Sequence, residues 1–239
     1  MISRAPKTWS FEGRRRRGGT SWVLALWHLF LWLGSSGCSS ESDPDGGGRG
    51  SAGAIDRSAL VRCAPEDGEA VATDEEIQRL AGCQLLEGIL RMGPEVTDLS
   101  PLSSLVVIER SLAGQSDRTD TYNFDALSSL RVIDRLLVIT DNACTSLAGL
   151  SSLEKVDSLV VRRNEQITDM RGMERLEEVS LLAVSDNAQL VSLDGLEGLR
   201  RVNGDVEIAL NPRLPQSVAE AFVDGLEVSG NITVQRNRE

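Results

Sequence analysis

The stretch "LVVRRNEQITDM" at 159–170 joins two different periods of apolar residues. In its first half, Leu159 and Val161 are two positions apart, which places them on one side of a strand. Beyond Asn164 the apolar residues are three positions apart, which does not suit a strand. An asparagine amide can bond the backbone groups that a sheet leaves unpaired at its end. We therefore expect a short strand, a turn at Asn164 and a segment that leads the chain back to a neighbouring strand.

The strand-and-turn pattern, apolar-x-apolar-x-x-Asn, recurs about every 23 residues along the chain. Its copies are "LVITDN" at 137–142, "LVVRRN" at 159–164, "LAVSDN" at 182–187, "VEIALN" at 206–211 and "ITVQRN" at 232–237. One coil of this length cannot bury its own apolar side, whereas parallel coils stacked about 4.8 Å apart can. The period therefore predicts a β-rich solenoid of parallel strands.

A short helix is expected on each side of the repeats. In "TDEEIQRLAG", Thr73 and Glu76 form a capping-box pattern before an apolar face. In "PQSVAEAFVDGL" a proline precedes a helical pattern, with Val218, Phe222 and Leu226 on the side expected to face the solenoid.

The sequence predicts a disulfide for two of the cysteines and a buried thiol for a third. Export favours oxidation, so we expect a disulfide between Cys63 and Cys83 across the first helix. Cys144 occupies the place that Ile167 holds in the next coil, so we expect a buried thiol there.

The N-terminal region has the organisation of an export signal. Four arginines at 14–17 precede the apolar run "WVLALWHLFLWLG" and the small residues "SSG". The apolar run is shorter than the roughly 20 residues that a bilayer-spanning helix needs. We expect a signal peptide at 1–37, a flexible Gly/Ser/Asp tether at 38–59 and a repeat domain at 60–239.

Cys38 resembles the lipidated cysteine of a bacterial lipobox, because small residues precede it. The leucine usual three positions before that cysteine is replaced by Ser35. We expect lipidation of Cys38, membrane attachment through this anchor and a location at the outer membrane or cell surface. The alternative is an ordinary signal peptide and a periplasmic or secreted protein.

Removal of residues 1–37 would change the chemistry available to the chain. It would take away the single histidine, His28, along with six basic residues and one acidic residue, and leave a net charge of −16. Without histidine, Ser-His-Asp catalysis and histidine-ligated metal sites are excluded. An acidic chain repels nucleic acid. We expect no cofactor, no metal and no nucleic-acid partner.

The segment "LAGCQLLEGILRM" at 80–92 resembles the opening of a receptor L domain, as in the insulin and epidermal growth factor receptors. The resemblance implies a right-handed, leucine-rich-repeat-like parallel β-helix over residues 60–239. The resemblance is carried by two cysteines and by a strand of the type Ile-Glu-Gly-x-Leu-x-Ile. Cys63 corresponds to the first cysteine and Cys83 to the second. The strand is represented here by Leu86, Glu87, Gly88, Leu90 and Met92. The C-terminal cysteine pair, the Cys-rich module and the kinase of such receptors are absent from these residues, so receptor signalling is not carried over. The sequence is instead similar to bacterial exported lipoproteins built from this repeat alone.

The outward side of the predicted sheet is the candidate binding face. Its apolar members would form an exposed patch, and such patches mark interaction sites. The receptor resemblance likewise implies that sheet faces bind protein ligands. The candidate residues are Leu136, Val138, Thr140, Val160, Arg162, Leu181, Ala183, Ser185 and Glu207. The alternative is that these residues are only good strand formers, or that a loop covers them.

We therefore expect a non-catalytic binding or adhesion module of the cell envelope, with a protein or glycan ligand. A structural spacer without a specific ligand is a second hypothesis. A polysaccharide-active enzyme would need paired carboxylates. Asp186, Asp205 and Glu207 lie on adjacent coils, but no catalytic spacing is fixed by the sequence. The identity of the ligand and the oligomeric state are not predicted.

Overall fold

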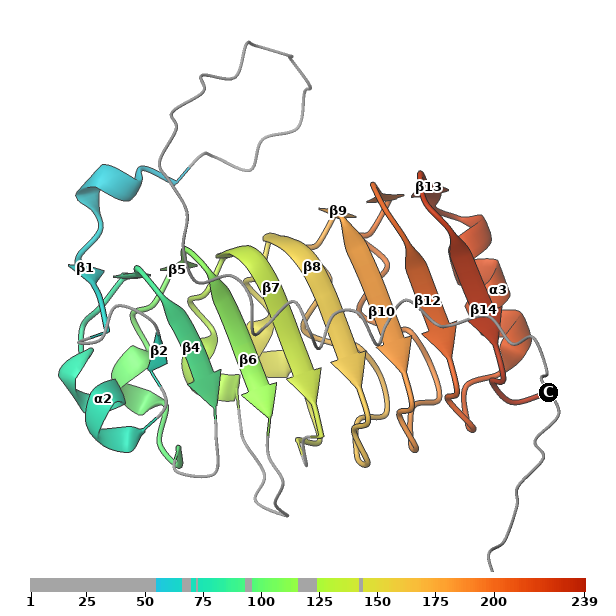
Figure 1. The fold of residues 1–239 in the computed structure, drawn as a ribbon, viewed down its shortest axis with the longest axis horizontal. Coiled ribbons are helices and arrows are strands. Elements are labelled where there is room, and N and C mark those ends of the chain that lie inside the picture. The colour runs from blue at the N-terminus through green and yellow to red at the C-terminus, as the bar shows by residue number, and fades with distance from the viewer. Residues whose placement is uncertain (1–54, 66–69, 72, 93–95, 116–123, 142–143) are drawn as a thin grey trace, which may run out of the picture. The chain divides into compact units, whose positions relative to one another are not determined.

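The computed structural model describes residues 55–65, 70–71, 73–92, 96–115, 124–141 and 144–239 (Figure 1). These residues belong to one compact unit, Ala54–Glu239. The expected signal peptide, Cys38 and most of the expected tether lie outside the described residues. No helix among the described residues is long and apolar enough to cross a membrane.

The described residues form a large parallel sheet, a small parallel sheet and short helices. The main, 11-stranded sheet contains β1 (Arg62–Cys63), β2 (Ala70–Val71), β3 (Leu85–Leu86), β4 (Ile89–Met92), β5 (Val107–Ile108), β6 (Ser111–Gln115), β7 (Val132–Thr140), β8 (Lys155–Arg162), β10 (Leu181–Ser185), β12 (Val206–Ala209) and β14 (Ile232–Gln235). The second, 3-stranded sheet contains β9 (Glu178–Val179), β11 (Arg201–Val202) and β13 (Glu227–Val228). The helices are α2 (Asp74–Arg79) and α3 (Gln216–Asp224), and the 3-10 turns are η1 (Arg57–Ala59), η2 (Ser100–Leu102), η3 (Phe124–Leu127) and η4 (Ala148–Leu150).

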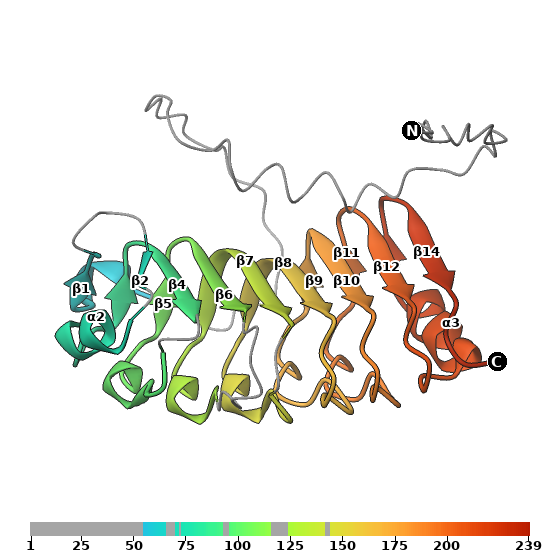
Figure 2. The ribbon, with the colours of Figure 1, turned by 60° about the horizontal axis from the view of Figure 1, so that its bottom comes forward.

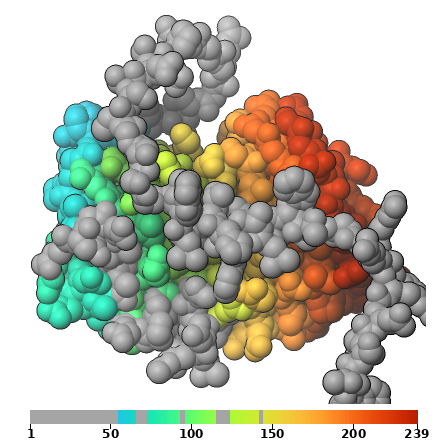
Figure 3. All heavy atoms as spheres, in the orientation of Figure 1, coloured from blue at the N-terminus to red at the C-terminus, as the bar shows by residue number. Residues whose placement is uncertain are grey.

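The coils of the solenoid follow one another in chain order. Strands β4, β6, β7, β8, β10, β12 and β14 lie side by side in this order in two views (Figures 1 and 2). The colours of the space-filling view change in the same order along the unit (Figure 3). Leu137, Leu159, Leu182, Val206 and Ile232 are consecutive partners across the sheet. The prediction of a solenoid of parallel strands is confirmed.

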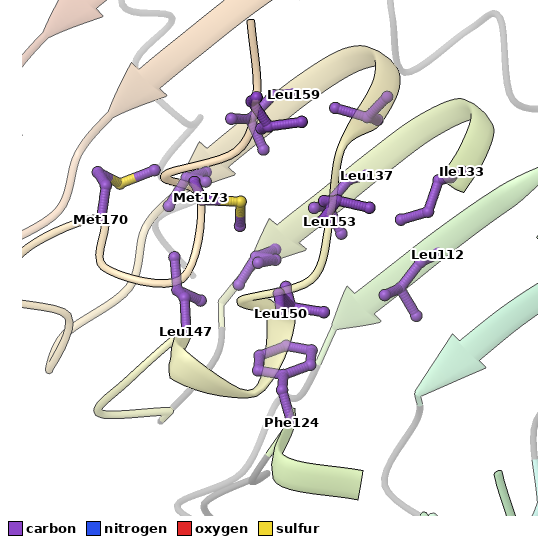
Figure 4. Close-up of a cluster of buried hydrophobic side chains, with 14 of the residues drawn as sticks. Leu112, Phe124, Ile133, Leu137, Leu147, Leu150, Leu153, Leu159, Met170 and Met173 are labelled. Atoms are coloured by element: carbon purple, nitrogen blue, oxygen red, sulfur yellow. The ribbon is translucent and has the colours of Figure 1, made fainter. Parts of the chain in front are cut away.

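The apolar residues of both periods meet inside the coils. Leu137 and Leu159 enter the core from the sheet, while Leu147, Leu150 and Met170 enter it from the return segments (Figure 4). All of these side chains are almost completely buried, as expected for coils that share one continuous core. Cys144 belongs to the same core, and its burial raises the pKa of the thiol to about 12. The prediction of a buried thiol is therefore confirmed.

Buried asparagines form a ladder where the strands end. The Asn187 amide donates to the Val161 carbonyl at 3.0 Å, and its own Oδ1 accepts from the Asn164 backbone at 3.1 Å. The Asn211 side chain makes the corresponding bonds one coil further on, to Val184 at 3.0 Å and from Asn187 at 3.0 Å. Each of these asparagines thus satisfies backbone groups of two coils, which gives the turn predicted at Asn164 its physical basis.

The N-terminal end is closed by α2 and a disulfide. Thr73 and Glu76 form the predicted capping box around the start of α2. Cys63 and Cys83 are bridged, with their Cα atoms 5.9 Å apart, so the predicted disulfide is present.

The folded unit begins earlier than residue 60. Ile55 packs against a small apolar cluster under the first strands. Arg57 makes a bidentate ion pair with Asp134, at 2.6 and 2.7 Å. Residues 55–59, expected to be tether, are therefore held by one apolar and one charged contact that a Gly- and Ser-rich composition does not reveal.

The side of α3 that contacts the core matches the predicted one only in part. Ala219 and Val223 are buried, whereas Val218 is 40% exposed. Phe222 and Leu226 are only partly buried against the core. The small side chain of Ala219 lets the helix approach closely, and that contact outweighs burial of the larger Val218.

Candidate functional site

The outward side chains of the main sheet are arranged in three rows, with one residue from each coil. The first row contains Ser111, Leu136, Ser158 and Leu181. The second contains Ala113, Val138, Val160, Ala183, Glu207 and Thr233. The third contains Thr140, Arg162, Ser185, Ala209 and Gln235. The nine candidate residues all belong to these rows, and the structure therefore brings them together on one face of the sheet.

The apolar part of this face is less exposed than predicted. Val160 is 9% exposed and Ala183 is 4% exposed, so both are buried, in contrast to the expected open patch. Leu136, Val138 and Leu181 are half-buried. Side chains in one row are only about 4.8 Å apart and cover each other's flanks, which lowers the exposure of short residues most.

Three charged side chains meet beside the apolar rows. Arg162 reaches toward Asp186 with 3.8 Å between Nη2 and Oδ2, which is a long ion pair. Glu207 is half-buried and has neither an ion pair nor a hydrogen bond within the described part of the chain. Loss of hydration raises the pKa of Glu207, the charge of Arg162 acts against that rise, and the charge of Asp186 adds to it. Glu207 is thus a partly desolvated carboxyl that forms no ion pair with another described residue.

Two buried polar atoms of the same face have no hydrogen-bond partner among the described residues. They are the hydroxyl of Ser185 and Nε of Arg162. Ser185 is completely buried between its row neighbours Arg162 and Ala209. Most buried polar atoms in proteins are paired, so two unpaired atoms on adjacent strands are unusual.

Thr140 is occupied by contacts within the protein. Its hydroxyl donates to Asp141 at 3.1 Å, and Arg163 donates to the same carboxylate at 2.7 and 2.5 Å. The hydrogen bond from Arg163 is the main cause that lowers the pKa of Asp141. The Thr140 hydroxyl is therefore already engaged within the protein.

Asp141 is a residue of this face that the strand pattern did not identify, because it lies one position beyond its strand. Both Asp141 and Asp186 have left-handed backbones, with φ of 50° and 58°. Arg163, Leu210 and Arg236 have the same conformation directly before Asn164, Asn211 and Asn237, so the sequence signal is the position before the asparagine.

Of the carboxylates considered for catalysis, Asp186 and Glu207 are close enough for their charges to interact, whereas Asp205 is bound within a turn. Asp205 accepts from the Asn231 backbone at 2.7 Å and from its side chain at 3.2 Å, which assigns it to the turn before β12. The charged neighbours of Glu207 are Arg162 and Asp186. Among the described residues no group of three or more His, Cys, Asp or Glu side chains is placed to hold a metal ion.

Comparison with known proteins adds little to this description. No protein-family model matches the chain, and no curated protein matches it. Among solved structures, an internalin of Listeria monocytogenes is similar at 16% sequence identity with a TM-score of 0.35. The likeness covers 70% of this chain and 60% of the internalin chain. The resemblance to receptor L domains therefore stays a prediction, and the fold rests on the strand pairing described above.

Proposed function

We propose that this chain is a non-catalytic binding module whose main sheet contacts a protein partner through its outward rows. The observation that carries the proposal is that Leu136, Val138 and Leu181 are half-buried on the outward side of the main sheet. The same face carries the charged side chains of Arg162 and Glu207. Apolar contact surface next to convergent polar groups is the usual composition of a recognition site.

The solenoid supports this role because it holds these side chains on a fixed support. Each strand of the face pairs with a neighbour on both sides from β7 to β12, and the asparagine ladder fixes the following turns. A preformed surface loses little conformational freedom on binding.

The proposal includes attachment to the bacterial envelope. Support comes from the basic, apolar and small segments before Cys38 and from the Gly- and Ser-rich stretch after it. A lipid on Cys38 would hold the solenoid at the outer membrane or cell surface with its sheet available to a neighbouring protein. Cys38→Ser should move the chain from the membrane fraction to the soluble fraction. Retention of this variant in the membrane would contradict lipid anchoring.

Capture from envelope extracts tests the binding function. The full chain is compared with a variant that carries Val138→Glu and Leu181→Glu, because both side chains are half-buried and can accept a charge without entering the core. Val191→Glu is the matched control, since Val191 is 42% exposed and lies outside the main sheet. Circular dichroism establishes that all three are folded.

A partner captured by the wild type and by Val191→Glu, but lost from the double variant, supports the proposal. Equal capture by all three proteins would contradict a site on the sheet. Capture of a polysaccharide in place of a protein would move the function to glycan binding, and absence of any partner would favour a structural spacer.

A further inference from the structure

The asparagine ladder ends on a glutamine from the α3 helix. Asn237, the last asparagine of the ladder, donates through its side chain to the Ile208 carbonyl of the preceding strand at 3.0 Å. The side chain of Gln216 donates in the same way to the Val234 carbonyl at 3.1 Å. Ile208 and Val234 are partners across the sheet. Gln216 therefore binds the carbonyl that an asparagine of a further coil would bind.

The oxygen of the same glutamine amide completes the match to the ladder. Oδ1 of Asn211 accepts from the Asn187 side chain at 3.2 Å, and Oδ1 of Asn237 accepts from the Asn211 side chain at 3.2 Å. Oε1 of Gln216 accepts from the Asn237 side chain, again at 3.2 Å. Glu220, one turn further along α3, accepts from Nε2 of Gln216 at 2.9 Å and helps to hold the amide in place. Gln216 thus makes both side-chain hydrogen bonds of a ladder asparagine.

The hydrogen bond to Val234 lies on the free edge of the main sheet. Strand β14 is the last in the order of the sheet, with α3 beside it, and among the described residues it pairs with β12 alone (Figures 1 and 2). The Val206 amide of β12 donates to the Asn231 carbonyl at 2.9 Å. Because alternate residues of a parallel strand bond to opposite neighbours, the backbone groups of Ile232 and Val234 face away from β12.

The same edge exposes an apolar side chain that every earlier coil buries. Ile232 is 54% exposed, whereas its sheet partner Val206 is 1% exposed. An exposed apolar edge strand is a template for pairing with another chain, and natural proteins protect such edges. The edge of β14 therefore needs protection, and Gln216 is the side chain bound to it.

A second copy of the chain is the partner that this edge fits by symmetry. Two β14 strands related by a two-fold axis run antiparallel and present the same residues to each other. Ile232 and Val234 are the residues of β14 that face the edge, so pairing along the strand needs the Val234 carbonyl. We infer that Gln216 ends the ladder in place of a further coil and prevents β14 from pairing with a second copy. This inference does not depend on the partner proposed for the outward rows.

Protection of the edge is tested by sedimentation velocity of the full chain over a range of concentrations. Wild type is compared with Gln216→Ala, with Gln216→Ala plus Ile232→Lys, and with Gln235→Ala. The lysine places a charge on the edge, which opposes strand pairing. Gln235→Ala is the matched control, because Gln235 is an exposed glutamine of the same strand. Circular dichroism establishes that all four proteins are folded.

We expect Gln216→Ala to raise the association constant of the dimer about tenfold or more, because it removes a hydrogen bond that competes for the edge. Addition of Ile232→Lys should return association to the wild-type level. Gln235→Ala should change it by less than about twofold, as for an ordinary surface substitution.

Thermal unfolding tests the ladder role separately. Gln216→Ala should lower the melting temperature by about 2–6 °C, because the Asn237 amide loses an acceptor and the Val234 carbonyl a donor. In an Asn237→Ala background the same substitution should lower it by a smaller amount, because one of the two ladder partners of Gln216 is already gone.

Each part of the inference has its own contradicting result. Unchanged association of Gln216→Ala, or association that Ile232→Lys does not reverse, would reject protection of the edge. Equal losses of melting temperature in the wild-type and Asn237→Ala backgrounds would reject Gln216 as the end of the ladder.

Discussion

At the residue scale, Asn187 shows how one side chain supports two coils. It is completely buried and donates to the Val161 carbonyl at 3.0 Å. Its Oδ1 accepts from the backbone and the side chain of Asn164, at 3.1 and 3.0 Å. Removal of this amide leaves buried donors and an acceptor unpaired, and each such group costs about 1–3 kcal/mol.

Asn187→Ala should therefore lower the free energy of unfolding by at least about 3 kcal/mol in urea denaturation. Asn203→Ala is the control, because Asn203 is exposed and its side-chain amide donates to the Glu178 carboxylate on the surface. The control should change stability by less than about 1 kcal/mol. Equal losses for the two variants would show that the ladder has no special role.

Glu207 should make a pH-dependent contribution to stability. Its pKa in the folded chain is raised above the ordinary value of 4.5 by loss of hydration. The folded state consequently holds this proton to higher pH than the unfolded state, and stability falls as pH rises through the folded pKa. Glu207→Gln should raise the melting temperature at neutral pH, and the difference should vanish below about pH 4.

The measurement is thermal unfolding of wild type and Glu207→Gln across this pH range. Asp224→Asn, on an exposed part of α3, is the control for removal of a negative charge. A lower melting temperature for Glu207→Gln at neutral pH would mean that the carboxylate is stabilised in the free protein. That result would contradict the description of Glu207 as a partly desolvated carboxyl without an ion pair among the described residues.

At the element scale, close approach of successive return segments depends on a glycine. Gly195 has φ of 106°, and a Cβ there would lie 2.1 Å from the Met170 carbonyl oxygen of the preceding coil. Gly195→Ala should destabilise the protein by more than about 2 kcal/mol, because left-handed strain and the backbone clash act together.

Gly225→Ala is the matched substitution at an ordinary backbone conformation. A Cβ at Gly225 would approach nothing closer than the Phe222 carbonyl oxygen at 3.4 Å. This variant should be neutral or more stable by up to about 1 kcal/mol. Chemical denaturation of both proteins checks the pair, and similar losses at the two glycines would contradict the proposed close approach.

The elements also show what sequence can predict and where it fails. The spacing of Leu159, Val161 and Asn164 predicts a strand and a turn because both depend on local chemistry, and the pattern recurs in the sequence of the coils from β7 to β14. The bulge in β7, where Asp134 and Arg135 oppose Asp157 alone, depends on one extra residue that the repeat does not locate. The side of α3 that enters the core depends on how closely Ala219 can approach, which is a tertiary property.

The candidate site was predicted only in part for a similar reason. Alternation along the strands assigns Val160, Arg162 and Ser185 to the outward side, as the pairing has them. Alternation contains no information on how far neighbouring rows cover Val160, or on which donors remain unpaired. Those properties arise from contacts between coils, and only the structure contains them.

At the scale of the whole molecule, the disulfide closes one end of a solenoid whose other coils are held by packing, hydrogen bonds and ion pairs. The Cys63–Cys83 bridge encloses a loop with a sequence separation of 20. Loss of such a bridge removes very roughly 3 kcal/mol through the greater freedom of the unfolded chain.

Cys63→Ala with Cys83→Ala should therefore lower the melting temperature, and a reducing agent should lower that of the wild type but not of the double variant. Thermal unfolding with and without reductant checks this expectation. Identical melting of oxidised wild type and double variant would show that the end of the solenoid does not depend on the bridge.

The central claim is that the main sheet contacts a partner, and site-specific photocrosslinking in cells that naturally produce the chain tests it most directly. A benzophenone amino acid is placed at Leu181, on the sheet face, or at Val191, which is exposed outside the main sheet. The account predicts a crosslinked protein from position 181 and none from position 191. A crosslink from position 191 alone, or from neither position, would contradict binding through the sheet.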